Sequence, residues 1–195
     1  MIGCGSPDLD DKETLDGIIA EAIDAHNLKK RGNKGEKLRY APNEQTPYTG
    51  WTKGMYDNGQ IRWLRQFKDG KRDGISRLWY SNGQKKSEAN RKDGKYMSAV
   101  SWKPDGEKCP DTNVKDGNGV SVWYYENGKK RVEGNYKDGK LVTGFAWKPN
   151  GDKCPVTNVV NGNGVVVWYR KDGTERVRYP YKDGKEEDVW IPTVD

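Results

Sequence analysis

Apolar and polar residues alternate along most of this chain in short stretches, and each stretch ends at a turn that contains glycine. In the stretch GVSVWYYENG, Val120, Val122 and Tyr124 share one face of an extended strand, while the residues between them share the other face. Asn-Gly and Asp-Gly pairs at the ends of such stretches are strong signals for hairpins with type I′ turns. The pattern therefore predicts a mainly β protein built from β-hairpins.

The turns recur at a nearly fixed interval. The glycines of a first series are 22 to 24 residues apart and occur at Gly59, Gly83, Gly106, Gly128, Gly151 and Gly173. A second series follows the first at a constant distance of 11 residues, at Gly70, Gly94, Gly117, Gly139, Gly162 and Gly184. A regular period of this length indicates a repeat architecture. We expect residues 45–187 to form six stacked hairpins in an elongated, single-layer antiparallel meander, with a C-terminal tail at 188–195.

A longer repeat is superimposed on the hairpins. Residues 102–124 and 147–169 are almost identical and lie 45 positions apart. Each copy contains a Lys-Cys-Pro sequence, with Pro110 and Pro155 inside an arm of a hairpin. Because proline cannot donate a ladder hydrogen bond, we expect a bulge or an irregular crossing at these two places.

The segment before the repeats has a different period. Apolar residues follow helical spacing at Leu15, Ile18, Ile19, Ala22 and Ile23. Asp10 or Asp11 suits the start of the helix, and the basic residues before Gly32 suit its end. After a leader remnant at 1–10, residues 11–44 are therefore predicted to be a helix and a linker. We interpret this amphipathic helix as a cap on the open edge of the sheet, with a partner-binding helix as the alternative.

Composition supports a fold with a thin aromatic core. Hydrophobic residues make up only 32% of the chain, yet it contains 8 Trp and 11 Tyr. The net charge of +6 is weak evidence for binding to nucleic acid. The longest apolar stretch, GVVVWY, is far shorter than the roughly 20 residues that span a bilayer.

The sequence offers few groups for catalysis. It has a single histidine, His26, and three cysteines whose spacing does not suit a zinc site. We therefore expect no enzyme, no metal and no cofactor. Cys109 and Cys154 occupy equivalent positions about four strands apart, too far for a disulfide, and are predicted to be free thiols.

The repeat unit resembles a known family. The segments YSNGQKKSEANRKDGK and YYENGKKRVEGNYKDGK are similar to the MORN repeat variant of bacterial proteins that are described as YwqK-type antitoxins. The resemblance covers roughly residues 45 to 185 and implies a sheet of stacked hairpins that acts as a scaffold. The antitoxin description implies a protein partner.

The first residues, MIGCGS, resemble the end of a bacterial lipoprotein signal, in which Cys4 would carry the lipid. This resemblance implies a chain trimmed from an exported parent and placed in the cell envelope or periplasm. The charged and apolar regions that precede such a cysteine are missing from the sequence. A cytoplasmic location is therefore the alternative.

Two equivalent positions are predicted to bind a partner. Trp102 with Lys103, and Trp147 with Lys148, place a flat ring beside a positive charge at a turn. We hypothesise a non-catalytic scaffold for protein–protein interaction that uses these residues. The alternatives are a module for a cell-envelope glycan or a choline-like head group, binding of anionic membrane lipid through the lysine-rich turns, and a purely structural role for both rings.

Overall fold

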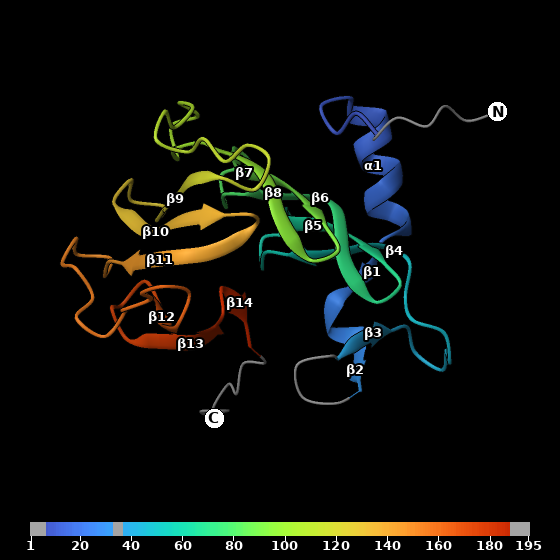
Figure 1. Cartoon of the computed structure of the whole chain (residues 1–195). Helices are drawn as coiled ribbons and strands as arrows, with labels where there is room; N and C mark the ends of the chain where they lie inside the picture. Colours follow the sequence, from blue (N-terminus) through green and yellow to red (C-terminus); the bar gives the residue numbers. More distant parts are fainter. Residues whose placement is uncertain (1–6, 33–36, 188–195) are drawn as a thin grey trace.

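The computed structural model describes residues 7–32 and 37–187. Strands and isolated bridges account for 52% of the described residues and helical residues for 7%, with one α-helix near the beginning of this part, so the predicted mainly β class is confirmed (Figure 1). The elements are α1 (Lys12–Glu21), β1 (Ile23–Asp24), η1 (Ala25–Asn27), β2 (Lys29–Arg31), β3 (Leu38–Tyr40), β4 (Gly50–Met55), β5 (Ile61–Lys68), β6 (Lys71–Trp79), β7 (Lys85–Lys92), β8 (Lys95–Ser101), β9 (Gly119–Tyr124), β10 (Lys130–Lys137), β11 (Lys140–Ala146), β12 (Gly164–Tyr169), β13 (Glu175–Lys182) and β14 (Lys185–Glu186).

The sequence pattern predicted one continuous sheet, but the hairpins form several separate sheets. The order of the first sheet is β1-β4-β5-β6-β7-β8, and it is followed by separate sheets β11-β10-β9 and β12-β13-β14 and a small pair, β2-β3. The divisions fall at the two Lys-Cys-Pro segments, where only isolated bridges such as Trp102–Lys108 and Trp147–Lys153 occur. The irregular crossing expected at Pro110 and Pro155 is confirmed, and it interrupts the meander twice.

The two series of turns have different backbone geometry. In the second series both central residues have positive φ, for example 48° at Asp69 and 76° at Gly70, as a type I′ turn requires. In the first series only the glycine has positive φ, 79° at Gly59, and its N–H donates to the carbonyl of Tyr56 at 2.9 Å. This is a type I turn closed by a glycine bulge, and the strand register shifts beside it. The prediction of type I′ turns is therefore correct for the second series and wrong for the first.

Side chains of the first turns tie neighbouring repeats together. A tyrosine hydroxyl donates to a backbone carbonyl one repeat later in three pairs, Tyr56–Trp79 (2.8 Å), Tyr80–Trp102 (2.8 Å) and Tyr125–Trp147 (2.7 Å). The turn asparagine donates in the same way in the pairs Asn58–Ser81, Asn82–Pro104 and Asn127–Pro149. Repetition of the turn thus fixes the stacking of the hairpins as well as the hairpin itself.

We call each of the three larger sheets a unit. Each unit has a cover on one face, which we call the outer face. Val122 and Val167 are fully buried there, under Cys109 and Cys154 of the two Lys-Cys-Pro segments. Each thiol contacts a tyrosine hydroxyl, Cys109 at 3.2 Å and Cys154 at 2.8 Å. Both cysteines are buried and free, as predicted.

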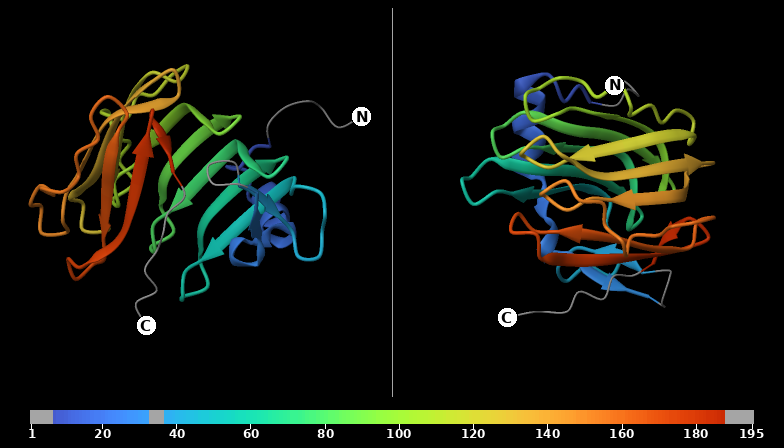
Figure 2. Two further views of the ribbon diagram at one scale, coloured as in Figure 1. Left: turned by 60° about the horizontal axis from the view of Figure 1, so that its bottom comes forward. Right: turned by 90° about the vertical axis from the view of Figure 1, so that its left-hand side faces the viewer.

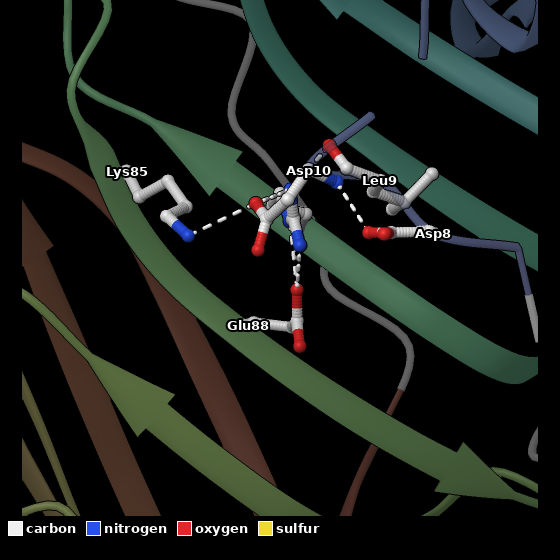
Figure 3. A network of polar contacts seen from close by, with 6 residues as sticks. Asp8, Leu9, Asp10, Lys85 and Glu88 are labelled. Atoms are coloured by element: carbon white, nitrogen blue, oxygen red, sulfur yellow. Dashed lines mark hydrogen bonds and ion pairs between the residues drawn. The ribbon is translucent and has the colours of Figure 1, made fainter. Parts of the chain in front are cut away.

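The N-terminal segment covers the outer face of the first unit. Arg77 occupies the position of Val122, 45 residues earlier, and is only 5% exposed. Its guanidinium donates to the carbonyl of Leu9 at 2.6 Å and forms ion pairs with Asp10 and Glu88. Figure 3 shows Lys85 to the left of Asp10 and Glu88 below it, with Leu9 and Asp8 of the N-terminal segment to the right. One buried cation thus anchors the N-terminal segment to the sheet.

Helix α1 differs from the prediction in length and placement. Asp11 caps its start through Thr14, as expected, but the helix ends at Glu21 because Ala22 is extended. Strand β1 then pairs in parallel with β4, with Ile23 opposite Thr52. The open edge of the sheet is therefore covered by β1, while Leu15, Ile18 and Ile19 of the helix pack on the outer face. His26 is exposed in the short helix η1.

The array of hairpins curls, in contrast to the extended form expected from the repeats. The second-series turns meet strands of other hairpins, so that the N–H of Tyr96 donates to the carbonyl of Gly139 at 3.2 Å. The rings of Tyr96 and Tyr136 lie 4.6 Å apart. Figure 2 shows the sheets side by side around this curl, with β13 and β14 in red on the side away from α1. The face opposite the covers is consequently an inner face.

Candidate binding surface

The structure places both predicted tryptophan sites at the edge formed by the first turns. Trp102 and Trp147 are half-buried, and their backbone carbonyls accept the tyrosine hydrogen bonds described above. The cation beside each ring comes from a different strand than predicted. The ammonium of Lys85 lies 5.1 Å from the ring of Trp102, and that of Lys130 lies 5.2 Å from the ring of Trp147.

The two predicted lysines have other partners. Lys103 forms an ion pair with Glu107 at 2.6 Å. Lys148 lies 5.9 Å from the ring of Tyr169. The structure therefore brings each tryptophan together with a lysine, but not with the lysine next to it in the sequence. Cys4, the predicted lipidation site, lies outside the described residues.

The inner face carries a second set of cations over aromatic rings, which we call the Tyr–cation ladder. It consists of three pairs, with 5.5 Å from cation to ring for Arg62–Tyr56, 4.8 Å for Lys86–Tyr80 and 5.3 Å for Arg131–Tyr125. Lys85 binds Asp10 on the outer face, and a register shift between Leu78 and Trp79 leaves Lys86 on the inner face.

The electrostatic environment of the ladder is strongly positive. Burial, together with the nearby charges of Arg131 and Arg62, lowers the pKa of Lys86 to about 7. Burial also lowers the pKa of Arg131, whose guanidinium packs over Trp168 at 4.3 Å. The Nε atom of Arg131 is buried without a hydrogen-bond partner in the described part of the chain.

Counter-ions for the ladder are scarce. Within the described residues, no carboxylate forms an ion pair with Arg62, Lys86 or Arg131. The charge of Glu126 acts on Lys86, but Glu126 is itself paired with Lys171 at 2.5 Å. Partly buried cations that lack anions are energetically unfavourable, and an external carboxylate or phosphate would relieve them.

Sequence reasoning missed this ladder, although the sequence contains a signal for it. In each pair the cation follows the tyrosine of the first turn by six residues. Alternation alone does not reveal the register shift that leaves Lys86 on the inner face. No group of His, Cys, Asp and Glu suited to a metal ion occurs in residues 7–32 and 37–187. None of the described helices is long and apolar enough to cross a membrane.

Two of the hairpins match a known family. Residues 72–93 and 118–138, which contain Tyr80 and Tyr125, match the family model described as the MORN repeat variant. MORN repeats are generally non-catalytic modules for binding or scaffolding. Comparisons with curated proteins and with solved structures gave no match for the chain.

Proposed function

We propose that this protein is a non-catalytic scaffold that binds an acidic segment of a partner protein along its Tyr–cation ladder. The observation that supports this function is the row of three inward cations, Arg62, Lys86 and Arg131, each over a tyrosine and none paired with a carboxylate of the described residues. Carboxylates of an extended acidic segment would supply the missing counter-ions. The hydrogen bonds between repeats keep the cations at fixed positions, so little ordering is needed on binding.

The antitoxin-like role implied by the sequence is a special form of this function. In that form the acidic partner would be a toxin that the scaffold inhibits. Attachment to the cell envelope through a lipidated Cys4 belongs to the same proposal, because it would determine the compartment in which the scaffold binds its partner. Trp102 and Trp147 give less support to a choline-like ligand, since Lys85 and Lys130 already lie over their rings.

The pKa of Lys86 provides a direct test. We expect a fluorescein-labelled poly-glutamate peptide to bind more weakly at about pH 8.5 than at about pH 6, by roughly threefold or more, because Lys86 loses its charge above a pKa of about 7. The peptide carboxylates stay ionised across this range. Lys86→Arg should bind with nearly constant affinity at both pH values, because arginine stays protonated. Fluorescence anisotropy measures all four affinities.

Lys86→Met and the control Lys129→Met complete this test. Lys129 is an exposed lysine in a first-series turn, and at about pH 6 its removal changes the net charge by the same amount. We expect weak binding that does not vary with pH for Lys86→Met and nearly unchanged binding for Lys129→Met. Equal affinities of Lys86→Met and the unaltered protein at about pH 6, where Lys86 is charged, would rule out the ladder as the binding surface.

A further inference from the structure

A cavity lies at the opposite end of the strands from the Tyr–cation ladder. Its volume is about 410 Å³, and it forms where four second-series turns converge, at Gly70, Gly94, Gly139 and Gly184. The two ends of a strand such as β5 (Ile61–Lys68) are about 25 Å apart, so the cavity and the ladder are separate places on the molecule.

The cavity is surrounded by cations because of the turn sequence itself. A lysine follows the Asp-Gly pair in each of the four turns, and it begins the next strand. These residues, together with two arginines, form what we call the basic ring, which consists of Lys71, Arg72, Arg91, Lys95, Lys140 and Lys185. Four lysines that are far apart in the sequence therefore meet only because the array curls.

The turns are held close together by backbone contacts. The carbonyl of Gly139 accepts from Tyr96, and that of Gly184 accepts from Leu141 at 3.0 Å. The turn at Gly139 therefore lies on the strand that begins at Lys95, and the turn at Gly184 on the strand that begins at Lys140. The backbone positions of these lysines are consequently set by the stacked turns.

The basic ring is short of counter-ions. Within residues 7–32 and 37–187, none of its six members forms an ion pair. Burial, and then the charge of Arg91, lower the pKa of Arg72, while Glu186 acts in the opposite direction. Asp93, Glu186 and Glu187 are the acidic residues among those that line the cavity, against nine cationic side chains.

The walls add aromatic surface to this positive charge. Tyr96, Tyr136 and Tyr181 line the cavity together with Phe67. The guanidinium of Arg91 lies 4.8 Å from the ring of Tyr96, so the rings hold part of the basic ring in place. The volume falls within the range of roughly 300–1,000 Å³ that is typical of small-molecule sites.

The geometry points to a binding site for a compact polyphosphate anion inside the basic ring. Lysine ammonium groups act as mobile point charges, and arginines give paired donors, so together they can serve several phosphate oxygens that lie in different directions. An extended acidic segment would place only a few of its carboxylates within a cavity of this size. This site differs from the proposed protein-binding surface in position and in ligand.

Binding of inorganic tripolyphosphate tests the site. We expect isothermal titration calorimetry at physiological ionic strength to detect binding, and the double variant Lys140→Ala/Lys185→Ala to weaken it by about tenfold or more, because each lost charge-assisted hydrogen bond affects affinity by about this factor. The matched control is Lys137→Ala/Lys182→Ala. Lys137 and Lys182 lie in the same two turns on the other side of the Asp-Gly pair, are exposed and do not line the cavity. We expect the control to bind within about twofold of the unaltered protein.

Three results would overturn the site. One is the absence of tripolyphosphate binding by the unaltered protein, and another is an equal loss in the two double variants, which would indicate unspecific attraction. The third is binding to phosphatidylserine vesicles without any competition by tripolyphosphate, which would assign the anion to a lipid surface. Thermal unfolding of both variants confirms that exposed lysines were removed without loss of the fold. Lys86→Met, which disables the ladder, should leave tripolyphosphate binding unchanged, so that failure of one proposal is distinguished from failure of the other.

Discussion

Arg77→Val is expected to lower the free energy of unfolding by about 3 kcal/mol, since removal of this buried cation leaves Glu88 without its ion pair and the Leu9 carbonyl without its donor. The side chain of Arg77 is 7% exposed and holds the Leu9 carbonyl, Asp10 and Glu88 at once. Valine occupies the equivalent positions 122 and 167, where it is fully buried. The new residue therefore suits the sheet, and the loss comes from the N-terminal segment that Arg77 anchors.

Chemical denaturation measures the change in the free energy of unfolding, and limited proteolysis shows which segment is loosened. We expect faster cleavage near Lys12 in Arg77→Val, because the segment over the outer face would detach first. Lys85→Met is the control, since it removes the exposed pair with Asp10 and a cation over the half-buried ring of Trp102, and it should change stability by about 1 kcal/mol or less. If Arg77→Val lowered the free energy of unfolding by less than about 1 kcal/mol, burial of Leu9 alone would be enough to hold the N-terminal segment on the sheet.

Gly117→Ala is expected to lower the free energy of unfolding by a similar amount, for a different reason. Gly117 has a φ of 81°, and an added Cβ would lie 2.5 Å from the backbone nitrogen of Gly139. That nitrogen donates to the carbonyl of Gly117 at 2.9 Å, so the methyl group would push two stacked turns apart. The backbone of Gly139 cannot move aside as a flexible side chain can. We therefore expect the free energy of unfolding to fall by about 3–4 kcal/mol, from the strain of a positive φ and from overpacking.

Gly94→Ala separates the two contributions. Gly94 belongs to the same type of turn, with a φ of 77° after Asp93 at 50°, but an added Cβ there would meet nothing within 4 Å. Its loss should therefore reflect backbone strain alone, about 1–2 kcal/mol. Thermal and urea unfolding of the two variants measure the difference. Equal losses would contradict a role for turn stacking in holding the curl together.

The sequence predicted those parts of the fold that depend on local periodicity. Turn glycines and alternation locate the strands, and Asp11 locates the start of α1, because these signals act over a few residues. The end of α1 was missed because Ile23 continues the helical apolar pattern, and only pairing with Thr52 in the sheet makes it extended. The breaks in the meander were foreseen at Pro110 and Pro155, but the separation into several sheets was not.

The candidate surfaces depend on contacts between distant parts of the chain, which periodicity does not encode. Lys85 and Lys86 are neighbours in sequence but lie on opposite faces, and a register shift at the preceding turn decides which one is buried. The basic ring requires Lys71 and Lys185 to meet across a curl. A repeat sequence states what each hairpin contains, whereas the twist of the sheets and the two proline breaks decide which hairpins meet.

The covers on the outer face determine how this array can change in length. Each of the two later units brings its own lid in the Lys-Cys-Pro segment, with Cys109 over Val122 in one and Cys154 over Val167 in the other. Only the first unit takes its lid from outside the repeats. A block of 45 residues is therefore self-sufficient: if it is inserted or removed as a whole, every remaining strand pair keeps a lid of the same shape. The gene can lengthen or shorten in steps of this one module, whereas half a module would expose a bare apolar face.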